Sequence, residues 1–290
     1  MEKEYICKEE YLENIRNFRL MDDDFMSKVF DNNKKCTSLL VNIILERNDL
    51  VIKRVDAQKK IKNLQGRSII LDICAVDNDG KLYNIEVQRS DKGAVPQRAR
   101  YNSSIIDANI TSPGDDYEDL AETYVIFITE KDVLKGNRPI YHIERVIRET
   151  GEDFNDGAHI IYVNGENMDD TPLGALMHDF NCKNPDDMKY PELAESTRYF
   201  KEDEEGVANM CEMMENMVNK VKEQADKEKA KAVAETSERE RIEMARSLLL
   251  LGKNSFEEIS LCSKLPLEEV KKLAAELGKW NIDITENYNK

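Results

Sequence analysis

Two carboxylates, Asp72 and Glu86, have the setting and the spacing of a metal-binding pair. Asp72 lies inside the apolar run 67–76, where a carboxylate costs free energy unless something compensates its charge. Glu86 lies in segment 81–89, where apolar and polar residues alternate as in a strand with one buried face. The turn-forming residues 77–80, Asp-Asn-Asp-Gly, separate the two segments and predict a β-hairpin. Counted outward from this turn, position 72 pairs near 85 or 86, so we expect Asp72 and Glu86 to be neighbours on one face.

Two carboxylates held this close repel each other, so that either one is protonated or both bind a cation. Oxygen ligands on a rigid pair of strands suit Mg²⁺, with Mn²⁺ as an alternative, and leave room for waters and a substrate phosphate. Such an ion lowers the pKa of a bound water and stabilises charge on the phosphate. A solvent-facing position would also fit the alternation around Glu86, whereas the apolar neighbours on both sides of Asp72 argue against that alternative there.

The elements that must position this pair are a mixture of helices and strands. The apolar patterns predict helices over 22–30, 36–45 and 94–110, and strands over 50–55, 67–76, 81–89, 123–129, 140–148 and 159–163. Segment 123–129 is almost continuously apolar, as expected of a buried central strand. This order of elements predicts an α/β fold with a mixed sheet between helices.

The overall charge restricts how the chain can bind nucleic acid. It contains 42 Lys and Arg residues against 58 Asp and Glu residues, a formal net charge of −16. Proteins that hold nucleic acid by their overall field are usually basic, because phosphate contacts dominate the affinity. Any nucleic-acid role must therefore depend on a local basic patch or on metal ions that offset the carboxylates.

Other composition features exclude several classes of protein. No segment approaches the roughly 18–20 apolar residues that span a bilayer, and the first residues lack the pattern of a secretory signal. We therefore expect a cytoplasmic protein without membrane contacts. The six cysteines form no C-x-x-C pair and are expected to be reduced, and the three histidines have no zinc-ligand spacing.

The sequence around the two carboxylates resembles a known family. Leu71-Asp72, followed across the hairpin turn by Ile85-Glu86-Val87-Gln88, is similar to the signature of the PD-(D/E)XK nuclease superfamily. More closely, residues 20–165 resemble the Rpn-type recombination-promoting nucleases, also called PD-(D/E)XK family transposases. The segments that carry this resemblance are 22–26, 62–67, 84–88, 98–101, 122–129 and 162–165.

The resemblance implies a fold and an activity. The fold is α/β, with a restriction-endonuclease-like PD-(D/E)XK core in which helices flank a mixed central sheet, followed by an all-helical C-terminal region. The activity is that of a bacterial DNA endonuclease that promotes recombination or mobile-element activity. Asp72 and Glu86 become metal ligands, Gln88 takes the place of the superfamily's lysine, and Asp23 matches an acidic position on the first helix that reaches the same site. Asp23 also fits a simple helix N-cap.

Two departures from the superfamily pattern affect the expected chemistry. Leu71 replaces the proline before the motif aspartate, which matters little because the carboxylate carries the function. Gln88 can orient the attacking water through hydrogen bonds but cannot lower its pKa by charge. Many members of the family carry glutamine here, so the change does not by itself indicate an inactive enzyme.

A short basic segment follows Glu86. It contains Arg89, Lys92, Arg98 and Arg100, with Tyr101 adjacent. We expect Arg98 to supply the missing cation and to stabilise the transition-state phosphate, with Lys92 or Arg100 as alternatives. Arg89, Lys92, Arg100 and Tyr101 are the candidates for substrate binding. A solvated helix face paired with acidic neighbours would produce the same pattern.

The C-terminal third is predicted to be helical throughout. We expect a nuclease-like domain over 1–200, a long charged helix or short coiled coil over 201–240, and a small helical tail over 241–290. Helix 208–234 carries an apolar stripe that fits either docking on the nuclease domain or a homodimer. The tail, with helices over 242–251 and from 255 and 267, resembles a helix-turn-helix. Its last helix has both glutamates and lysines, so DNA reading and a role as an interaction tail both remain open.

Three functions fit these observations. The leading hypothesis is a Mg²⁺-dependent DNA endonuclease. The main alternative is a catalytically weak or inactive nuclease fold that acts as a DNA-binding or oligomerising protein, which the acidic charge and Gln88 favour. The third is a nuclease for RNA, because the metal chemistry does not distinguish the sugars.

Overall fold

The computed structural model describes residues 8–63, 66–89 and 93–278. The chain divides into two compact units, Met1–Met213 and Met214–Lys290, which are described separately.

The first unit contains a six-stranded mixed sheet with the strand order β1-β2-β3-β4-β6-β5. β1, β2 and β3 pair antiparallel, β3, β4 and β6 are parallel, and β5 pairs antiparallel with β6. The strands are β1 (Ile52–Ile61), β2 (Ile69–Asp77), β3 (Leu82–Gln88), β4 (Thr123–Thr129), β5 (Ile140–Ile143) and β6 (Ala158–Asn164). The predicted α/β class and mixed sheet are therefore confirmed.

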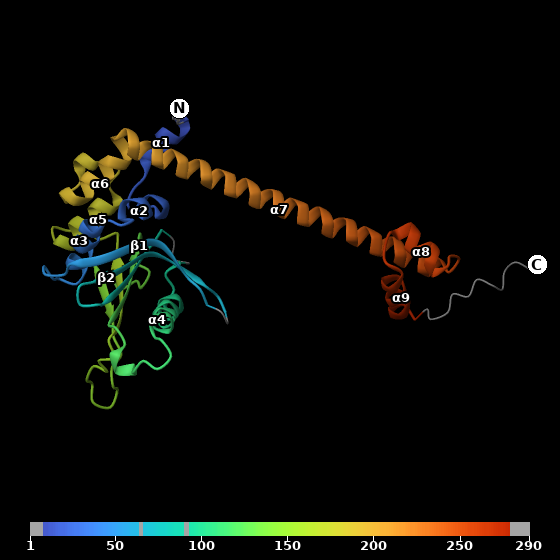
Figure 1. Ribbon diagram of the computed structural model, residues 1–290, viewed down its shortest axis with the longest axis horizontal. Coiled ribbons are helices and arrows are strands. Elements are labelled where there is room, and N and C mark those ends of the chain that lie inside the picture. Colours follow the sequence, from blue (N-terminus) through green and yellow to red (C-terminus); the bar gives the residue numbers. More distant parts are fainter. Residues whose placement is uncertain (1–7, 64–65, 90–92, 279–290) are drawn as a thin grey trace, which may run out of the picture. The chain divides into compact units, whose positions relative to one another are not determined.

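Helices cover both faces of this sheet (Figure 1). α4 (Pro96–Ile110) packs against β1, β4 and β6 on one face. α2 (Asp23–Phe30) and α3 (Lys34–Ile44) pack against the other face, and α3 in turn contacts α5 (Pro172–Asn181) and α6 (Pro191–Glu202). α1 (Glu9–Asn17) packs on α6, and short 3-10 turns occupy Tyr117–Asp119 and Pro185–Asp187.

The core beneath α4 is built from side chains that alternate along the strands. Ala99, Ile105 and Ile106 of α4 pack on Val125 and Phe127 of β4, all of them buried. Burial of this apolar surface is the main force that holds α4 against the sheet. It therefore fixes the α4 side chains that reach toward β3.

Three differences from the predicted elements have physical reasons. β1 extends to Ile61 rather than 55, because an edge strand needs no continuous apolar run and four of the five residues 56–60 are polar. β5 ends at Ile143 rather than 148. α1, α5 and α6 were not predicted, although Thr171 caps α5 with Pro172 at its first position, which is a readable helix start.

In the C-terminal part, α7 (Glu204–Leu251) is one helix rather than two. Residues 235–241 interrupt the apolar pattern but contain no Gly or Pro to break the helix. α7 ends at Gly252, whose φ of 66° suits a glycine C-cap.

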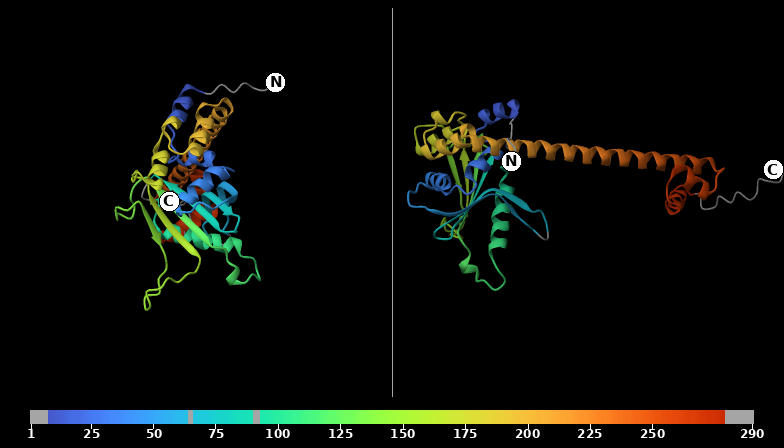
Figure 2. Two further views of the ribbon diagram at one scale, coloured as in Figure 1. Left: turned by 90° about the vertical axis from the view of Figure 1, so that its left-hand side faces the viewer. Right: turned by 45° about the horizontal axis from the view of Figure 1, so that its top comes forward.

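α8 (Phe256–Ser263) and α9 (Leu267–Glu276) pack beside the end of α7 (Figure 2). α8 begins with a capping box, in which Ser255 accepts from the Glu258 N–H and the Glu258 carboxylate accepts from the Ser255 N–H. The buried cluster of this unit consists of Ala245, Leu249, Ile259, Leu265, Val270 and Ala274.

The cysteines depart in part from the expectation of reduced thiols. Cys36, Cys74, Cys182 and Cys262 are free, whereas Cys211 is disulfide-bonded. Among the described residues, no helix combines the length and the apolar character required to cross a bilayer.

Candidate functional site

The β2–β3 hairpin brings Asp72 and Glu86 side by side. Its register runs from Val76↔Leu82 to Ile73↔Ile85, so the next position along places Asp72 beside Glu86. Both side chains are buried, with exposed fractions of 6% for Asp72 and 0% for Glu86. Among the described residues, the Asp72 carboxylate accepts one hydrogen bond, 3.1 Å from the Val87 N–H. Two acidic side chains therefore share a dry location with few donors.

The pKa values of both carboxyl groups are raised in this crowded, buried location. Burial raises the pKa of Asp72 to about 8, and the charges of Glu86 and Asp23 add to the effect. Burial also raises the pKa of Glu86, while its hydrogen bond from Asn84 and the charge of Arg98 act in the opposite direction. Two buried carboxylates with raised pKa values favour either a proton or a cation.

Glu86 is held in place by a chain of two amides. The Asn84 Nδ2 donates to Glu86 Oε1 over 2.9 Å, and the Asn102 Nδ2 donates to Asn84 Oδ1 over 3.1 Å. Because a carboxylate only accepts, it sets the orientation of Asn84 and, through it, that of Asn102. Both asparagines are buried, at 1% exposure each. Glu86 Oε1 is thus oriented from β3 and α4 together.

Arg98 of α4 links Glu86 with Gln88. Its guanidinium forms an ion pair with Glu86 Oε2 and donates from Nη1 to Gln88 Oε1 over 3.3 Å. A further bond to the Gly93 carbonyl, at 3.1 Å, and the face of the Phe127 ring, 5.8 Å from Cζ to the centroid, orient the guanidinium. The structure therefore brings together four of the predicted site residues, namely Asp72, Glu86, Gln88 and Arg98.

Asp23 lies at the edge of this group rather than inside it. It occupies the first turn of α2, is exposed, and accepts a hydrogen bond of 3.1 Å from Gln58 Nε2. Partial desolvation of its carboxyl group and the charge of Asp24 raise its pKa, whereas Gln58 and Arg98 act in the opposite direction. Within the described part of the chain, no group of three or more His, Cys, Asp or Glu side chains is spaced to hold a metal ion. Asp23 therefore acts on the carboxylate pair through its charge.

The predicted substrate-binding residues are dispersed. Arg89 pairs with Asp22 at 2.8 Å and approaches Glu130 at 3.7 Å, so acidic neighbours already engage it. Lys92 lies outside the described residues. Arg100 is exposed, and the Tyr101 hydroxyl donates to the Arg67 carbonyl over 2.5 Å. Arg100 and Tyr101 line a groove beside α4 that has a volume of about 960 Å³.

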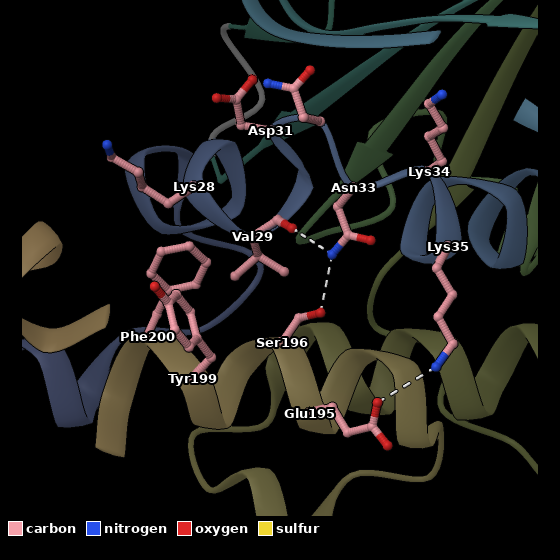
Figure 3. Close-up of a pocket in the computed structure, with 11 residues that line it drawn as sticks. Lys28, Val29, Asp31, Asn33, Lys34, Lys35, Glu195, Ser196, Tyr199 and Phe200 are labelled. Atoms are coloured by element: carbon pink, nitrogen blue, oxygen red, sulfur yellow. Dashed lines mark hydrogen bonds and ion pairs between the residues drawn. The ribbon is translucent and has the colours of Figure 1, made fainter. Parts of the chain in front are cut away.

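A second hollow, of about 600 Å³, lies between α2, α3 and α6 and contains none of the predicted site residues (Figure 3). Asn33 crosses it, donating to the Val29 carbonyl at 2.9 Å and to Ser196 Oγ at 3.0 Å. Lys35 pairs with Glu195 at 3.4 Å. These contacts satisfy the polar groups locally and suit helix packing rather than catalysis.

Comparison with known families identifies the family of this chain. A family model described as PD-(D/E)XK nuclease family transposase matches residues 24–248. The chain belongs to this family. The match includes Asp72, Glu86, Gln88 and Arg98 and begins one residue after Asp23. No curated protein and no solved structure matches the chain.

The carboxylate pair of this PD-(D/E)XK family member fits a divalent metal ion. Mg²⁺ and Mn²⁺ prefer oxygen ligands, and two carboxylates on adjacent strands supply them from a rigid frame. The raised pKa values mark negative charge that a cation would relieve. Of the four carboxylate oxygens, three have contacts of their own, to Val87, Asn84 and Arg98. Among the described residues, Arg98 is the one contact partner whose positive charge competes with a metal ion.

Sequence reasoning missed three residues of this site. Asn84 falls on the polar positions of an alternating strand and Asn102 was not singled out in the sequence, although both are buried. Gln58, which contacts Asp23, lies in β1 between the pairs Ala57↔Ile73 and Lys59↔Leu71, and is therefore opposite Asp72. Its φ of 50° is left-handed, a conformation that is uncommon outside glycine and that often occurs at functional sites. No pattern in the sequence signals that backbone geometry.

Proposed function

We propose that the protein is a Mg²⁺-dependent DNA endonuclease that hydrolyses phosphodiester bonds. The observation that carries this proposal is the buried pair Asp72 and Glu86, which would hold the ion, in a chain of the PD-(D/E)XK nuclease family. Mn²⁺ has the same ligand preferences and is expected to replace Mg²⁺. When bound, the ion would supply an activated water and stabilise charge on the phosphate.

The surrounding residues divide the remaining work. Gln88 would orient the attacking water through its amide, since it cannot provide charge. Arg98 already lies beside both Glu86 and Gln88, where its positive charge would stabilise the phosphate in the transition state. Asn84 and Asn102 would act as positioning residues, because they orient Glu86 without reaching the reacting atoms.

DNA is the substrate that the family description favours. Arg100 and Tyr101 lie along α4 next to Arg98 and would contact phosphates on either side of the cleaved bond. Arg89 would contribute less, because Asp22 and Glu130 already balance its charge. A role in recombination or mobile-element activity depends on the transposase description alone.

We also propose that the protein forms a homodimer through its C-terminal helices. α7 exposes apolar side chains that a monomer would leave in water, among them Met217, Val218, Val221, Val233 and Met244. Contact between two copies of α7 would bury this surface. We divide the functions accordingly, with cleavage in 1–200, association in 201–240, and an interaction tail in 241–290.

A catalytically weak or inactive nuclease fold is the second candidate. Gln88 stands in place of lysine, and Arg98 pairs with the carboxylate that would otherwise face the metal. If this ion pair persists, the chain would bind DNA without cutting it.

Plasmid nicking tests the proposal. We expect supercoiled DNA to be nicked with Mg²⁺ or Mn²⁺ and to stay intact with EDTA. Glu86→Gln should abolish nicking, whereas Glu122→Gln, a partly exposed carboxylate beside Lys81, should retain it. If the plasmid stays intact under every metal condition, the second candidate, an inactive nuclease fold that binds DNA, would be favoured instead.

A further inference from the structure

A groove opens directly beside the carboxylate pair, between the start of β2 and α4. It has a volume of about 960 Å³ and is lined by Arg67, Ser68, Ile69, Ile70, Val95, Gln97, Arg98, Arg100, Tyr101, Asn102 and Ser104. Arg98 belongs to both places, since it lines the groove and pairs with Glu86. A strand lying in the groove would therefore contact Arg98, which pairs with one of the two candidate metal ligands.

The charge of the groove is opposite to that of the whole protein. Among the described residues, its lining includes Arg67, Arg98 and Arg100 but no carboxylate, in a chain with a net charge of −16. Arg67 and Arg100 are exposed, so that their charges are available to a ligand. A concentrated positive patch on an acidic protein favours a polyanion such as a nucleic-acid backbone.

The groove also exposes aliphatic side chains between these arginines. Ile70 is 51% exposed and Val95 is 41% exposed, although both line the same groove. A paired duplex hides its base faces and presents phosphates, so it would leave these side chains in water. An unpaired strand presents both phosphates and base faces, and the faces pack on apolar side chains.

The size of the groove is also compatible with an unpaired strand. A volume of about 960 Å³ lies at the upper end of pockets that enclose small organic ligands, which reach roughly 1,000 Å³. That space is large enough for a few nucleotides of one strand.

Asn102, which lines the groove, has a buried acceptor without a hydrogen-bond partner among the described residues. Asn102 lines the groove and is 1% exposed, and its Nδ2 is committed to Asn84. In the described part of the chain its Oδ1 has no hydrogen-bond partner, which is costly for a buried polar atom. Because this oxygen is buried, a donor in the groove, such as a base amino group, reaches it only when the Asn102 side chain moves.

We propose that this groove binds an unpaired stretch of DNA next to the cleaved phosphate. The inference rests on the proposed nuclease function and narrows it to substrates with a single-stranded segment, such as forks, flaps or open ends. Ile70 and Val95 contact base faces, and Arg67 and Arg100 contact phosphates on the same strand.

The experiment measures binding of the full-length protein in EDTA, so that cleavage plays no part. Fluorescence anisotropy is recorded for a labelled 12-nucleotide DNA strand, for the same strand paired with its complement, and for the RNA strand of equal sequence. Ile70→Glu places a negative charge in the groove. Val51→Glu is the matched control, because Val51 is 56% exposed and does not line the groove.

We expect wild type to bind the unpaired DNA strand about tenfold more tightly than the duplex, and Ile70→Glu to remove about that factor. Val51→Glu should behave as wild type. Equal affinity for strand and duplex, an unchanged Ile70→Glu protein, or tighter binding of the RNA strand would each overturn the inference. If Ile70→Glu does not fold, as judged by its thermal unfolding, Arg100→Gln on the exposed side of α4 replaces it, with the same expected loss.

Cleavage separates this inference from the proposed function. Forked and fully paired substrates of one sequence are compared with Mg²⁺. Equal cutting of both substrates would contradict the binding of a single strand in the groove, but it would still support the nuclease function. Tight binding of the single strand with no cutting under any metal condition would support the proposed binding groove and contradict the nuclease function.

Discussion

Arg98 and Gln88 are hydrogen-bonded to each other, with 3.3 Å between Nη1 and Oε1. In the proposed function, Gln88 takes the place of the superfamily's lysine, and Arg98 of α4 supplies the cation instead. The same guanidinium pairs with Glu86, which places one positive charge between the candidate metal ligand and the candidate water-orienting amide. We therefore propose that Arg98 compensates for the absence of a lysine at position 88.

This arrangement predicts that Gln88→Lys partly restores the activity lost in Arg98→Gln. Arg98→Gln should lower the nicking rate by about 10²–10³, the loss that follows removal of a group that stabilises transition-state charge. Adding Gln88→Lys to that variant restores a cation on β3 and should recover about tenfold in rate. The rates are measured in single turnover with Mg²⁺. A wild-type rate in Arg98→Gln, or no recovery in the double variant, would contradict the assignment.

The raised pKa of Asp72 predicts that the metal-free protein becomes less stable as the pH rises. Its pKa in the folded state is about 8, above the value of about 3.9 in an unfolded chain. The folded state therefore binds more protons than the unfolded state between about pH 4 and 8, and its stability falls as the pH rises through that window.

Asp72→Asn removes this charge and keeps a side-chain oxygen for the Val87 N–H. In EDTA at pH 7.5, we expect its free energy of unfolding to exceed that of wild type by roughly 1–3 kcal/mol. The difference should shrink toward pH 4. Urea denaturation at several pH values provides the comparison, and a variant that is less stable at pH 7.5 would refute the prediction.

Asn84 should control activity through Glu86 rather than through the substrate. Asn84→Ala leaves Glu86 Oε1 without its donor and releases Asn102. Loss of such a partner typically lowers metal affinity or activity by about 10–100-fold. Mn²⁺ titration and the nicking rate report both effects. Asn109→Ala on the exposed side of α4 is the control, and equal behaviour of the two variants would rule out the positioning role.

Lys201 should matter for folding and not for chemistry. Its buried ammonium donates to the carbonyls of Phe18 at 2.6 Å and Arg16 at 3.2 Å, and also to that of Lys183. Lys201→Met leaves these acceptors without a donor and should cost about 2–4 kcal/mol of stability. Urea unfolding of this variant is compared with the exposed Lys189→Met. Equal stability of the two proteins would show that the buried contacts contribute little.

The proposed dimer predicts a change in mass rather than in activity per folded chain. Val221 is 68% exposed on α7, so Val221→Glu should not disturb the fold but should weaken a helix contact between copies. Light scattering after gel filtration should show wild type as a dimer and the variant shifted toward monomer. Lys222→Glu is the control for the change of charge alone. A monomeric wild type would contradict the proposed dimer.

The sequence predicted the β2–β3 hairpin and the meeting of Asp72 with Glu86, because an alternating pattern and a tight turn leave few registers. α4 was also predictable from its length and its apolar positions. Arg98 could be placed on the correct helix, but its contact with Gln88 depends on how α4 packs over Phe127.

Other features depend on contacts between distant segments. Asn84 and Asn102 are buried only because β3 and α4 face each other, and a polar residue in an alternating strand otherwise reads as exposed. The polar half of β1 looked like a loop because an edge strand needs no apolar run. Gln58 adopts a left-handed conformation that no local residue pattern requires.

The most direct test of the central claim combines ion binding and cleavage on the same protein samples. Mn²⁺ binding by calorimetry and plasmid nicking with Mn²⁺ are measured on wild type, Glu86→Gln and the control Glu122→Gln. The account predicts that Glu86→Gln loses ion binding and nicking together, while wild type and Glu122→Gln retain both. Nicking by Glu86→Gln at the wild-type rate, or full Mn²⁺ binding without Glu86, would contradict it.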